Sequence, residues 1–197
     1  MRIRGAIIDL DGTILDSAQL WDHLPCLFLE RQGIPVQKKQ GQELAVRLAS
    51  LSLREAIQAL AAEFKIDDSV ESMMHECNTL IADAYRHKLP LIAGAINGLK
   101  RLSEDGIKLC VATASDRLLA EAALARCKVL QYFAFIITEE DIGKSKRYPD
   151  IYYQAVQRLG LTIPECIIFE DADHAIKTAK EAGFTVYTSL SDYGTMQ

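Results

Sequence analysis

Two aspartates near the start of the chain have the type and spacing that chemistry requires. Asp9 and Asp11 flank a leucine and follow a run of apolar residues that is too short for a helix. Such a run, closed by Gly12, predicts a buried parallel strand that ends in a tight polar turn. Ligands of open α/β sheets bind at the carboxyl ends of the strands, which favours a functional role for both aspartates. An Asp-Gly turn is also a common way for a chain to leave a sheet, so this pattern alone leaves both interpretations open.

Polar residues follow three further predicted strands, at residues 107–112, 133–137 and 166–169. In chain order these residues are Thr113, Ala114 and Ser115, then Lys144 and Lys146, then Glu170 and Asp171. Because the carboxyl ends of parallel strands meet at one edge of a sheet, we expect all of them to lie near Asp9 and Asp11.

This combination of side chains is typical of a metal-assisted reaction at phosphate. Carboxylates gathered at one edge repel one another by about 4 kcal/mol per close pair at an effective dielectric constant of about 20, so they require a cation. An all-oxygen set without a neighbouring His or Cys fits Mg²⁺, which we predict as the cofactor. In phosphoryl transfer one carboxylate can attack the phosphate, a second can move protons, a lysine can neutralise charge, and a hydroxyl such as that of Thr113 can hold phosphate oxygens.

The second half of the chain has an order of predicted helices and strands that would position these residues. From residue 90 onward, predicted helices alternate with the strands, and a last strand is expected at 185–188. The helices are expected at 95–102, 116–126, 149–159 and 173–182. This alternation predicts an α/β fold with a parallel sheet, right-handed crossovers and helices on both faces.

The section between the first strand and this alternating half has helical periodicity and little strand signal. Its clearest helix is residues 53–64, where apolar residues recur at helical spacing. Weaker helical patterns cover 21–30, 42–49 and 70–85. We therefore predict a core domain made of residues 1–15 and 90–197, with an inserted all-helical domain of about four helices at 16–89.

Composition limits the classes of partner. The chain has 197 residues, a net charge of −5 and no long basic run, which argues against a nucleic acid or an anionic membrane surface. It has no apolar run of membrane-spanning length and no signal-peptide pattern at its start, so we expect a cytoplasmic protein. The five widely spaced cysteines are interpreted as reduced core residues. We expect a monomer that acts on a small molecule.

Taken together, the four polar segments resemble the motifs of the haloacid dehalogenase superfamily, in the branch with a helical cap that includes beta-phosphoglucomutase and many small-molecule phosphatases. The matching segments are Asp9-Leu10-Asp11-Gly12-Thr13, Thr113, Lys146 ahead of Pro149-Asp150, and Glu170-Asp171. Their order and spacing agree over essentially the whole chain. The resemblance implies a Rossmann-like core with the first strand at its centre, between the strands that carry Thr113 and Glu170-Asp171.

The resemblance also implies a role for each motif residue. Asp9 would be the nucleophile and a Mg²⁺ ligand, and Asp11 would be the general acid and base and would give its backbone carbonyl to the metal. Asp171, with Glu170, would complete the coordination, and Lys146 would pair with Asp9 and the phosphate. Substrate phosphate would be bound at Thr113, Ala114, Ser115 and Lys146. The acid at position 11 favours phosphate ester chemistry over carbon–halogen cleavage.

The third motif departs from the family pattern, which usually reads Lys-Pro-x-Pro-Asp. Here the segment is Lys-Arg-Tyr-Pro-Asp, and counting back from Pro149 selects Lys146. Lys144 remains an alternative if the loop is shifted. After the fourth motif the family often has a serine and then a glycine, where this chain has Ala172 and Ala175.

The cap offers two candidate substrate contacts. Arg54 falls near the place where the mutases carry an arginine for a second phosphate, although an exposed helix arginine is the alternative interpretation. Trp21 stands where the mutases have a histidine, and it is either a stacking surface for the substrate or simple packing. We therefore expect a Mg²⁺-dependent phosphatase that hydrolyses a small phosphorylated metabolite, such as a sugar phosphate, through an aspartyl phosphate. A phosphosugar mutase and a non-catalytic phosphate-binding protein are the alternatives.

Overall fold

A computed structural model describes residues 2–48, 51 and 53–193 of the chain. It divides into two compact units. The first consists of Met1–Asp16 and Leu89–Gln197, and the second of Ser17–Lys88. The assignment of these segments to a core domain and a cap domain stays a prediction.

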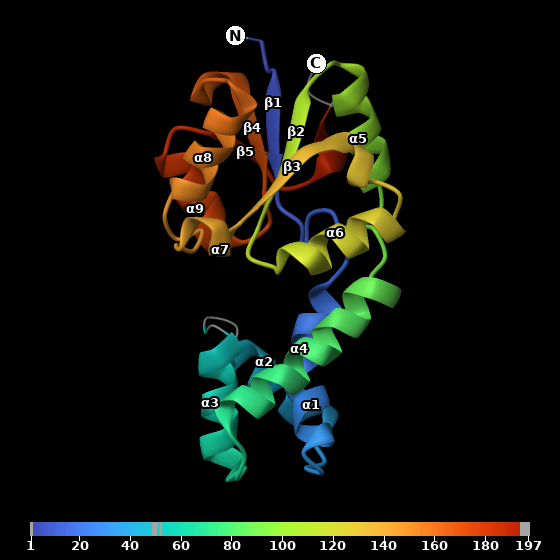
Figure 1. The fold of residues 1–197 in the computed structure, drawn as a ribbon, viewed down its shortest axis with the longest axis vertical. Coiled ribbons are helices and arrows are strands. Elements are labelled where there is room, and N and C mark those ends of the chain that lie inside the picture. The colour runs from blue at the N-terminus through green and yellow to red at the C-terminus, as the bar shows by residue number, and fades with distance from the viewer. Residues whose placement is uncertain (1, 49–50, 52, 194–197) are drawn as a thin grey trace. The chain divides into compact units, whose positions relative to one another are not determined.

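The first unit is built on a five-stranded parallel sheet in the order β3-β2-β1-β4-β5 (Figure 1). The strands are β1 (Gly5–Ile8), β2 (Lys108–Thr113), β3 (Phe133–Thr138), β4 (Cys166–Phe169) and β5 (Thr185–Tyr187). β1 lies at the centre, hydrogen-bonded to β2 on one side and β4 on the other, and all four of its residues are buried. The parallel α/β sheet predicted from the alternating pattern is therefore confirmed.

Helices cover both faces of this sheet. α8 (Asp150–Leu159) and α9 (Asp173–Glu181) lie on one face, and α5 (Ala95–Glu104) and α6 (Arg117–Arg126) on the other (Figure 1). On the α8 face, Ile7 belongs to a buried cluster that also contains residues of α8 and α9. The remaining elements are α7 (Glu139–Ile142) and 3₁₀ helices at Leu130–Tyr132, Ile163–Glu165 and Leu190–Asp192. α7 is absent from the sequence prediction.

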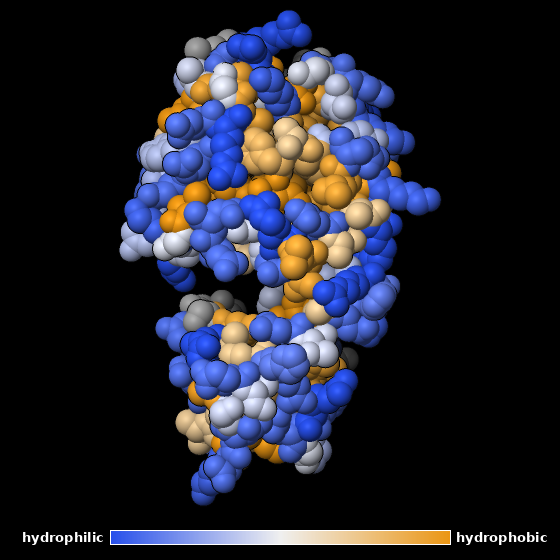
Figure 2. All heavy atoms as spheres, in the orientation of Figure 1, coloured by the Kyte–Doolittle hydropathy of each residue, from blue (hydrophilic) through white to orange (hydrophobic). Residues whose placement is uncertain are grey.

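The edge strand β3 carries hydrophobic side chains at the surface. Figure 2 shows hydrophobic residues gathered over β3, and Phe135 on this strand is only partly buried. The guanidinium of Arg158, on α8, lies 5.8 Å from the centre of the Phe135 ring. A charged group over an edge strand discourages pairing with another sheet, and the cation also gains from the aromatic face.

The second unit consists, in the part described, of four helices that pack around their own core. They are α1 (Ala18–Arg31), α2 (Lys38–Leu48), α3 (Leu53–Phe64) and α4 (Val70–His87). The buried cluster of this unit contains residues from all four helices, among them Phe28, Leu44, Ile57 and Met73. The helix predicted at 42–49 begins four residues earlier, and position 49 lies outside the described residues. The all-helical insertion is confirmed.

Two other sequence predictions concern the chain as a whole. None of the helices in the described ranges is both long and apolar enough to span a membrane. All five cysteines lie in those ranges as free thiols, with Cys77, Cys110 and Cys166 buried and the other two partly buried. The thiols are thus mostly core residues, as the sequence analysis predicts.

Candidate active site

The pairing of β1 with β4 brings two motif carboxylates together. Ile8 lies opposite Phe169 in the parallel register, and the Asp9 backbone N–H donates to the Phe169 carbonyl at 2.9 Å. Asp9 and Glu170 are therefore the first residues beyond two adjacent strand ends. Both side chains are withdrawn from solvent, with residue exposures of 7% for Asp9 and 1% for Glu170.

Lys146 joins these two carboxylates. Its Nζ donates a hydrogen bond to Asp9 Oδ1 and another to Glu170 Oε2, the latter at 2.8 Å. Although burial alone lowers the pKa of Lys146, the charges of Asp9 and Glu170 raise it well above its usual value, so the ammonium stays charged. Lys144 instead forms an exposed ion pair with Asp150 at 2.6 Å. The structure thus places Lys146 rather than Lys144 against Asp9.

The buried cluster of Asp9, Glu170 and Lys146 has more negative than positive charge. Burial is the main cause that raises the pKa of Asp9, and the neighbouring charges of Glu170 and Asp11 raise it further, while Lys146 lowers it. Two carboxylates and one ammonium sum to a net negative charge among side chains that are largely withdrawn from solvent. A further cation would stabilise the ionised form of Asp9.

Asp171 supplies the third member of an acidic trio with Asp9 and Glu170. One carboxylate oxygen from each of the three lies within 4.8 Å of the others, and the side chain of Asp171 is exposed where the other two are buried. Loss of hydration, and next the charge of Glu170, raise the pKa of Asp171. Three hard oxygen donors open to solvent on one side fit a divalent cation that keeps part of its water shell.

A glycine in the first motif makes room for the trio. A Cβ placed on Gly12 would lie 2.0 Å from Asp171 Oδ2 and 2.6 Å from its Cγ. Gly12 also has φ +83°, in the left-handed region that other residues rarely adopt. The turn after the two aspartates therefore requires glycine both for its backbone and for the approach of Asp171.

The end of β2 orients Asp11. The Ser115 hydroxyl donates to Asp11 Oδ2 at 2.6 Å, and the Ser115 backbone N–H donates to Thr113 Oγ1 at 3.0 Å. Thr113 is fully buried, whereas Ala114 between them is exposed. The Asp11 carboxylate is not among the clustered oxygens of the trio, so the structure brings Asp11 to the same sheet edge without making its side chain part of that cluster.

Two polar contacts at this site are missing from the sequence analysis. The Tyr152 hydroxyl, on the buried face of α8, donates to Glu170 Oε2 at 3.3 Å. The Lys146 backbone N–H donates to Glu139 Oε1 at 2.6 Å. A hydroxyl on the apolar face of the helix that follows the third motif, and an acid directly after β3, are the signals that could have indicated them.

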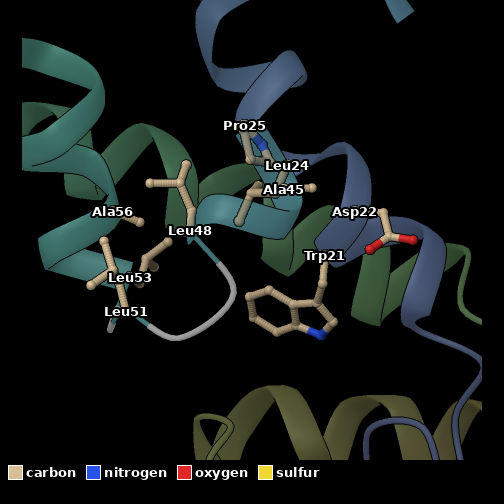
Figure 3. A pocket seen from close by; sticks show the side chains of 9 residues that line it. All are labelled: Trp21, Asp22, Leu24, Pro25, Ala45, Leu48, Leu51, Leu53 and Ala56. Atoms are coloured by element: carbon tan, nitrogen blue, oxygen red, sulfur yellow. The ribbon is translucent and has the colours of Figure 1, made fainter. Parts of the chain in front are cut away.

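The predicted substrate contacts of the insertion belong to the second unit. Arg54 Nη1 donates to Glu71 Oε1 at 3.3 Å in an exposed ion pair. Trp21, in the first turn of α1, has 39% of its surface exposed and lines a pocket between helices of this unit (Figure 3).

A Rossmann-like parallel sheet with an aspartate, a buried lysine and an acidic cluster at its carboxyl edge is the arrangement of the haloacid dehalogenase fold. The sequence model of the family described as "Haloacid dehalogenase-like hydrolase" matches residues 6–188, and the chain belongs to this family. Phosphatases of this family generally use a metal ion, and the acidic trio has the donors for one.

Curated relatives cover nearly the whole chain. It is 25% identical to the "Phosphorylated carbohydrates phosphatase" of Thermotoga maritima over 194 residues, 96% of this chain and 88% of the relative. It is 28% identical to the "Validoxylamine A 7'-phosphate phosphatase" of Streptomyces hygroscopicus subsp. limoneus, over 90% of this chain and 81% of the relative. Among solved structures, a "HAD hydrolase, family IA, variant 3" from Entamoeba histolytica has a TM-score of 0.76 at 24% identity, with 93% of this chain and 82% of that chain covered.

Proposed function

We propose that the protein is a Mg²⁺-dependent phosphatase that hydrolyses a small phosphorylated metabolite, a sugar phosphate, through an aspartyl phosphate. The observation that carries the proposal is the buried Lys146 ammonium between Asp9 and Glu170, with Asp171 beside them. A carboxylate can attack a phosphate dianion only where positive charge offsets the repulsion, and this site supplies one fixed cation and the donors for another.

Asp9 is the nucleophile in this proposal. Its carboxylate oxygen forms a bond to phosphorus while the bond from phosphorus to the leaving oxygen breaks. The hydrogen bond from Lys146 holds the attacking carboxylate in one orientation, and the ammonium remains charged throughout because of its two acidic partners. Lys146 and the strand end at Thr113, Ala114 and Ser115 bind the phosphate oxygens.

Asp11 moves the protons. It donates a proton to the leaving oxygen in the first step and accepts one from the water that attacks phosphorus in the second step, when the bond from Asp9 to phosphorus breaks. The hydrogen bond from the Ser115 hydroxyl, at 2.6 Å, directs the carboxylate of Asp11. Asp11 can serve in both steps because each step returns it to the protonation state that the next one needs.

Mg²⁺ would be held by Asp9, Glu170 and Asp171, with the backbone carbonyl of Asp11. When bound it supplies positive charge to the transferring phosphoryl group. The oxygen-only donor set supports this choice of metal, since neither Cys nor His is part of the acidic cluster. Monomeric state, cytoplasmic location and the absence of a nucleic-acid partner stay predictions.

Hydrolysis is preferred to a mutase reaction for two reasons that lie in the second unit. Arg54, the candidate for a second phosphate, already pairs with Glu71. Trp21, which cannot take part in proton transfer, stands where the mutases have a histidine. The names of two relatives, a phosphatase of phosphorylated carbohydrates and a validoxylamine phosphate phosphatase, support a phosphorylated sugar or a related ring compound as substrate.

The test is phosphate release from p-nitrophenyl phosphate and a panel of sugar phosphates, with Mg²⁺ and with EDTA. Wild type, Asp9→Asn and the matched pair Lys146→Met and Lys144→Met are compared. The proposal requires that EDTA, Asp9→Asn and Lys146→Met abolish turnover and that Lys144→Met retains it. A folded, Mg²⁺-loaded protein that hydrolyses nothing on the panel would contradict it and favour a mutase or a phosphate-binding protein.

A further inference from the structure

We propose that the segment from β5 to Tyr193 is a positioning element for Glu170, and that it acts through the backbone of Tyr187. The Glu170 backbone N–H donates to the Tyr187 carbonyl at 3.0 Å, one residue beyond the end of β4. The part of this segment that follows β5, residues 189–193, is called the strap. The role of Glu170 in metal binding rests on the proposed function, whereas the contact between the two backbones does not.

A single peptide unit joins the proposed nucleophile, Glu170 and the edge of the sheet. The carbonyl of Phe169 accepts from the Asp9 backbone N–H at 2.9 Å, and the N–H of the same peptide unit, that of Glu170, donates to Tyr187. A peptide unit is rigid and planar, so a group that holds one side of it limits the rotation of the whole. β5 therefore fixes the direction in which the Glu170 side chain leaves the backbone, and with it the carboxylate that Lys146 contacts.

The side chains at the ends of β4 and β5 reinforce this contact. Ile168 and Val186 pack in the cluster that contains residues of α8 and α9, so alternation along the strands places Phe169 and Tyr187 on the opposite face, toward α5. There the two rings stack with their centres 5.6 Å apart and their planes inclined by 28°. Phe169 is fully buried, so the ring of Tyr187 is held against a fixed partner.

β5 has little of its own to hold it in this position. It has three residues, lies at the edge of the sheet, and none of the three is buried. A short edge strand contributes few hydrogen bonds and little buried surface, so its pairing depends on how the flanking chain is anchored. The strap supplies that anchor.

The strap docks on α5 at a glycine. A Cβ placed on Gly98 would lie 2.5 Å from the Leu190 carbonyl oxygen and 2.9 Å from Leu190 Cβ, so this approach requires glycine. Glycine inside a helix is unfavourable relative to alanine, and the contact explains its place in α5. Leu190 is 2% exposed, and the Tyr193 hydroxyl donates to Asp105 Oδ2, at the C-cap of α5, at 2.8 Å. The strap is thus attached to α5 at two points.

Hydrogen exchange of the Glu170 amide, measured by NMR, tests the backbone link without metal or substrate. Gly98→Ala places a methyl group against the Leu190 backbone and should speed this exchange about fivefold or more, the factor that corresponds to one net hydrogen bond. The amides of β1 should exchange as in the wild type. Asn97→Ala is the matched control, because Asn97 is the exposed neighbour of Gly98 in α5, and it should leave the exchange of Glu170 unchanged.

Tyr193→Phe provides a milder perturbation of the same strap. It removes only the exposed hydrogen bond to Asp105, so the protein should fold. The Glu170 amide should exchange faster than in the wild type and more slowly than in Gly98→Ala. If Gly98→Ala does not fold, Tyr193→Phe decides the test.

Mg²⁺ affinity tests the positioning of the Glu170 carboxylate. Calorimetric titration of Gly98→Ala with Mg²⁺ should give a dissociation constant about tenfold or more above that of the wild type, as is typical when a group that orients a metal ligand is lost. For p-nitrophenyl phosphate, kcat at saturating Mg²⁺ should change much less than the Mg²⁺ concentration that gives half of the maximal rate, because the loaded site contains the same side chains. A merely structural role of the strap would not produce this split.

The two readouts separate the possible failures. Acceleration at Glu170 that spares β1, together with weaker Mg²⁺ binding, supports the proposal. Equal acceleration of both sets of amides, or acceleration at Glu170 with unchanged Mg²⁺ affinity, overturns it. If the wild type hydrolyses phosphate esters and neither variant changes the exchange of Glu170, the positioning role is overturned and the phosphatase stands. If the wild type binds Mg²⁺ but hydrolyses nothing, while the variants exchange faster at Glu170 and bind Mg²⁺ more weakly, the phosphatase is overturned and the positioning role stands.

Discussion

Removal of one hydroxyl group, by Tyr152→Phe, should destabilise the first unit because it takes a hydrogen bond from the buried carboxylate of Glu170. The Tyr152 hydroxyl is buried and donates to Glu170 Oε2 at 3.3 Å, the same oxygen that accepts from Lys146 at 2.8 Å. Burial is the main cause that raises the pKa of Tyr152; the charge of Lys146 lowers it, and the charges of Glu170 and Asp9 raise it, so the phenol is neutral and remains a donor.

The magnitude follows from these contacts. A hydrogen bond to a charged group contributes about 1.5–3 kcal/mol to stability. The 3.3 Å separation is long, and Lys146 still pairs with the same oxygen in the variant, so the loss should lie near the lower limit, about 1.5 kcal/mol. In a protein of this size that corresponds to a decrease in Tm of roughly 3–6 °C. Phenylalanine keeps the ring, which lies 6.0 Å from the ring of Phe184.

Urea unfolding followed by far-ultraviolet circular dichroism measures this loss, because the tryptophan emission reports only on the second unit. Tyr153→Phe is the matched control: the two tyrosines are adjacent on α8 and both lie near Phe184, but Tyr153 is 44% exposed. We expect the control to stay within about 0.5 kcal/mol of wild type. Equal midpoints for the two variants would refute the claim that the Tyr152 hydroxyl stabilises the buried Glu170.

Three further predictions concern the backbone contact of Lys146, the glycine of the first motif and the five thiols. Glu139→Ala removes the acceptor for the Lys146 backbone N–H and should lower kcat for p-nitrophenyl phosphate about tenfold or more. Glu139→Gln keeps an oxygen acceptor and should lower kcat less. Equal kcat values for the two variants would contradict this role of Glu139. Gly12→Ala should weaken Mg²⁺ binding, measured by calorimetry, because its Cβ would meet the Asp171 carboxylate, and unchanged affinity would be the contrary result. Because three of the five thiols are buried, a thiol reagent at pH 8 should rapidly modify at most two per native chain and all five after unfolding; rapid reaction of more than two would contradict the burial.

The sheet, and the set of residues that lie at the carboxyl ends of its strands, were predictable because both depend on local sequence patterns. The sequence itself shows a short apolar run that ends just before Asp9 and an alternation of helices and strands after residue 90. Parallel pairing of the strands then brings their carboxyl ends together. Counting back from Pro149 selects Lys146 over Lys144, and it is Lys146 that contacts Asp9 in the structure, while Lys144 pairs with Asp150. The catalytic role of Lys146 stays a prediction.

Contacts that depend on the packing of helices were not predictable. Tyr152 and Glu170 are 18 residues apart, and their hydrogen bond depends on how α8 lies on the sheet. Likewise the partner of Arg54 is Glu71, 17 residues away on the next helix, and nothing in the spacing of the two residues indicates that they meet. Side-chain partners of this kind are set by tertiary structure rather than by periodicity.

The central claim is that Asp9 carries the phosphoryl group during turnover. The most direct measurement is rapid quenching of the reaction with p-nitrophenyl phosphate and Mg²⁺, followed by borohydride reduction and peptide mass spectrometry, because borohydride converts an aspartyl phosphate to homoserine. The account predicts homoserine at position 9 in the wild type and none when EDTA is present. Labelling at another residue, or full hydrolytic activity in Asp9→Asn, would contradict it.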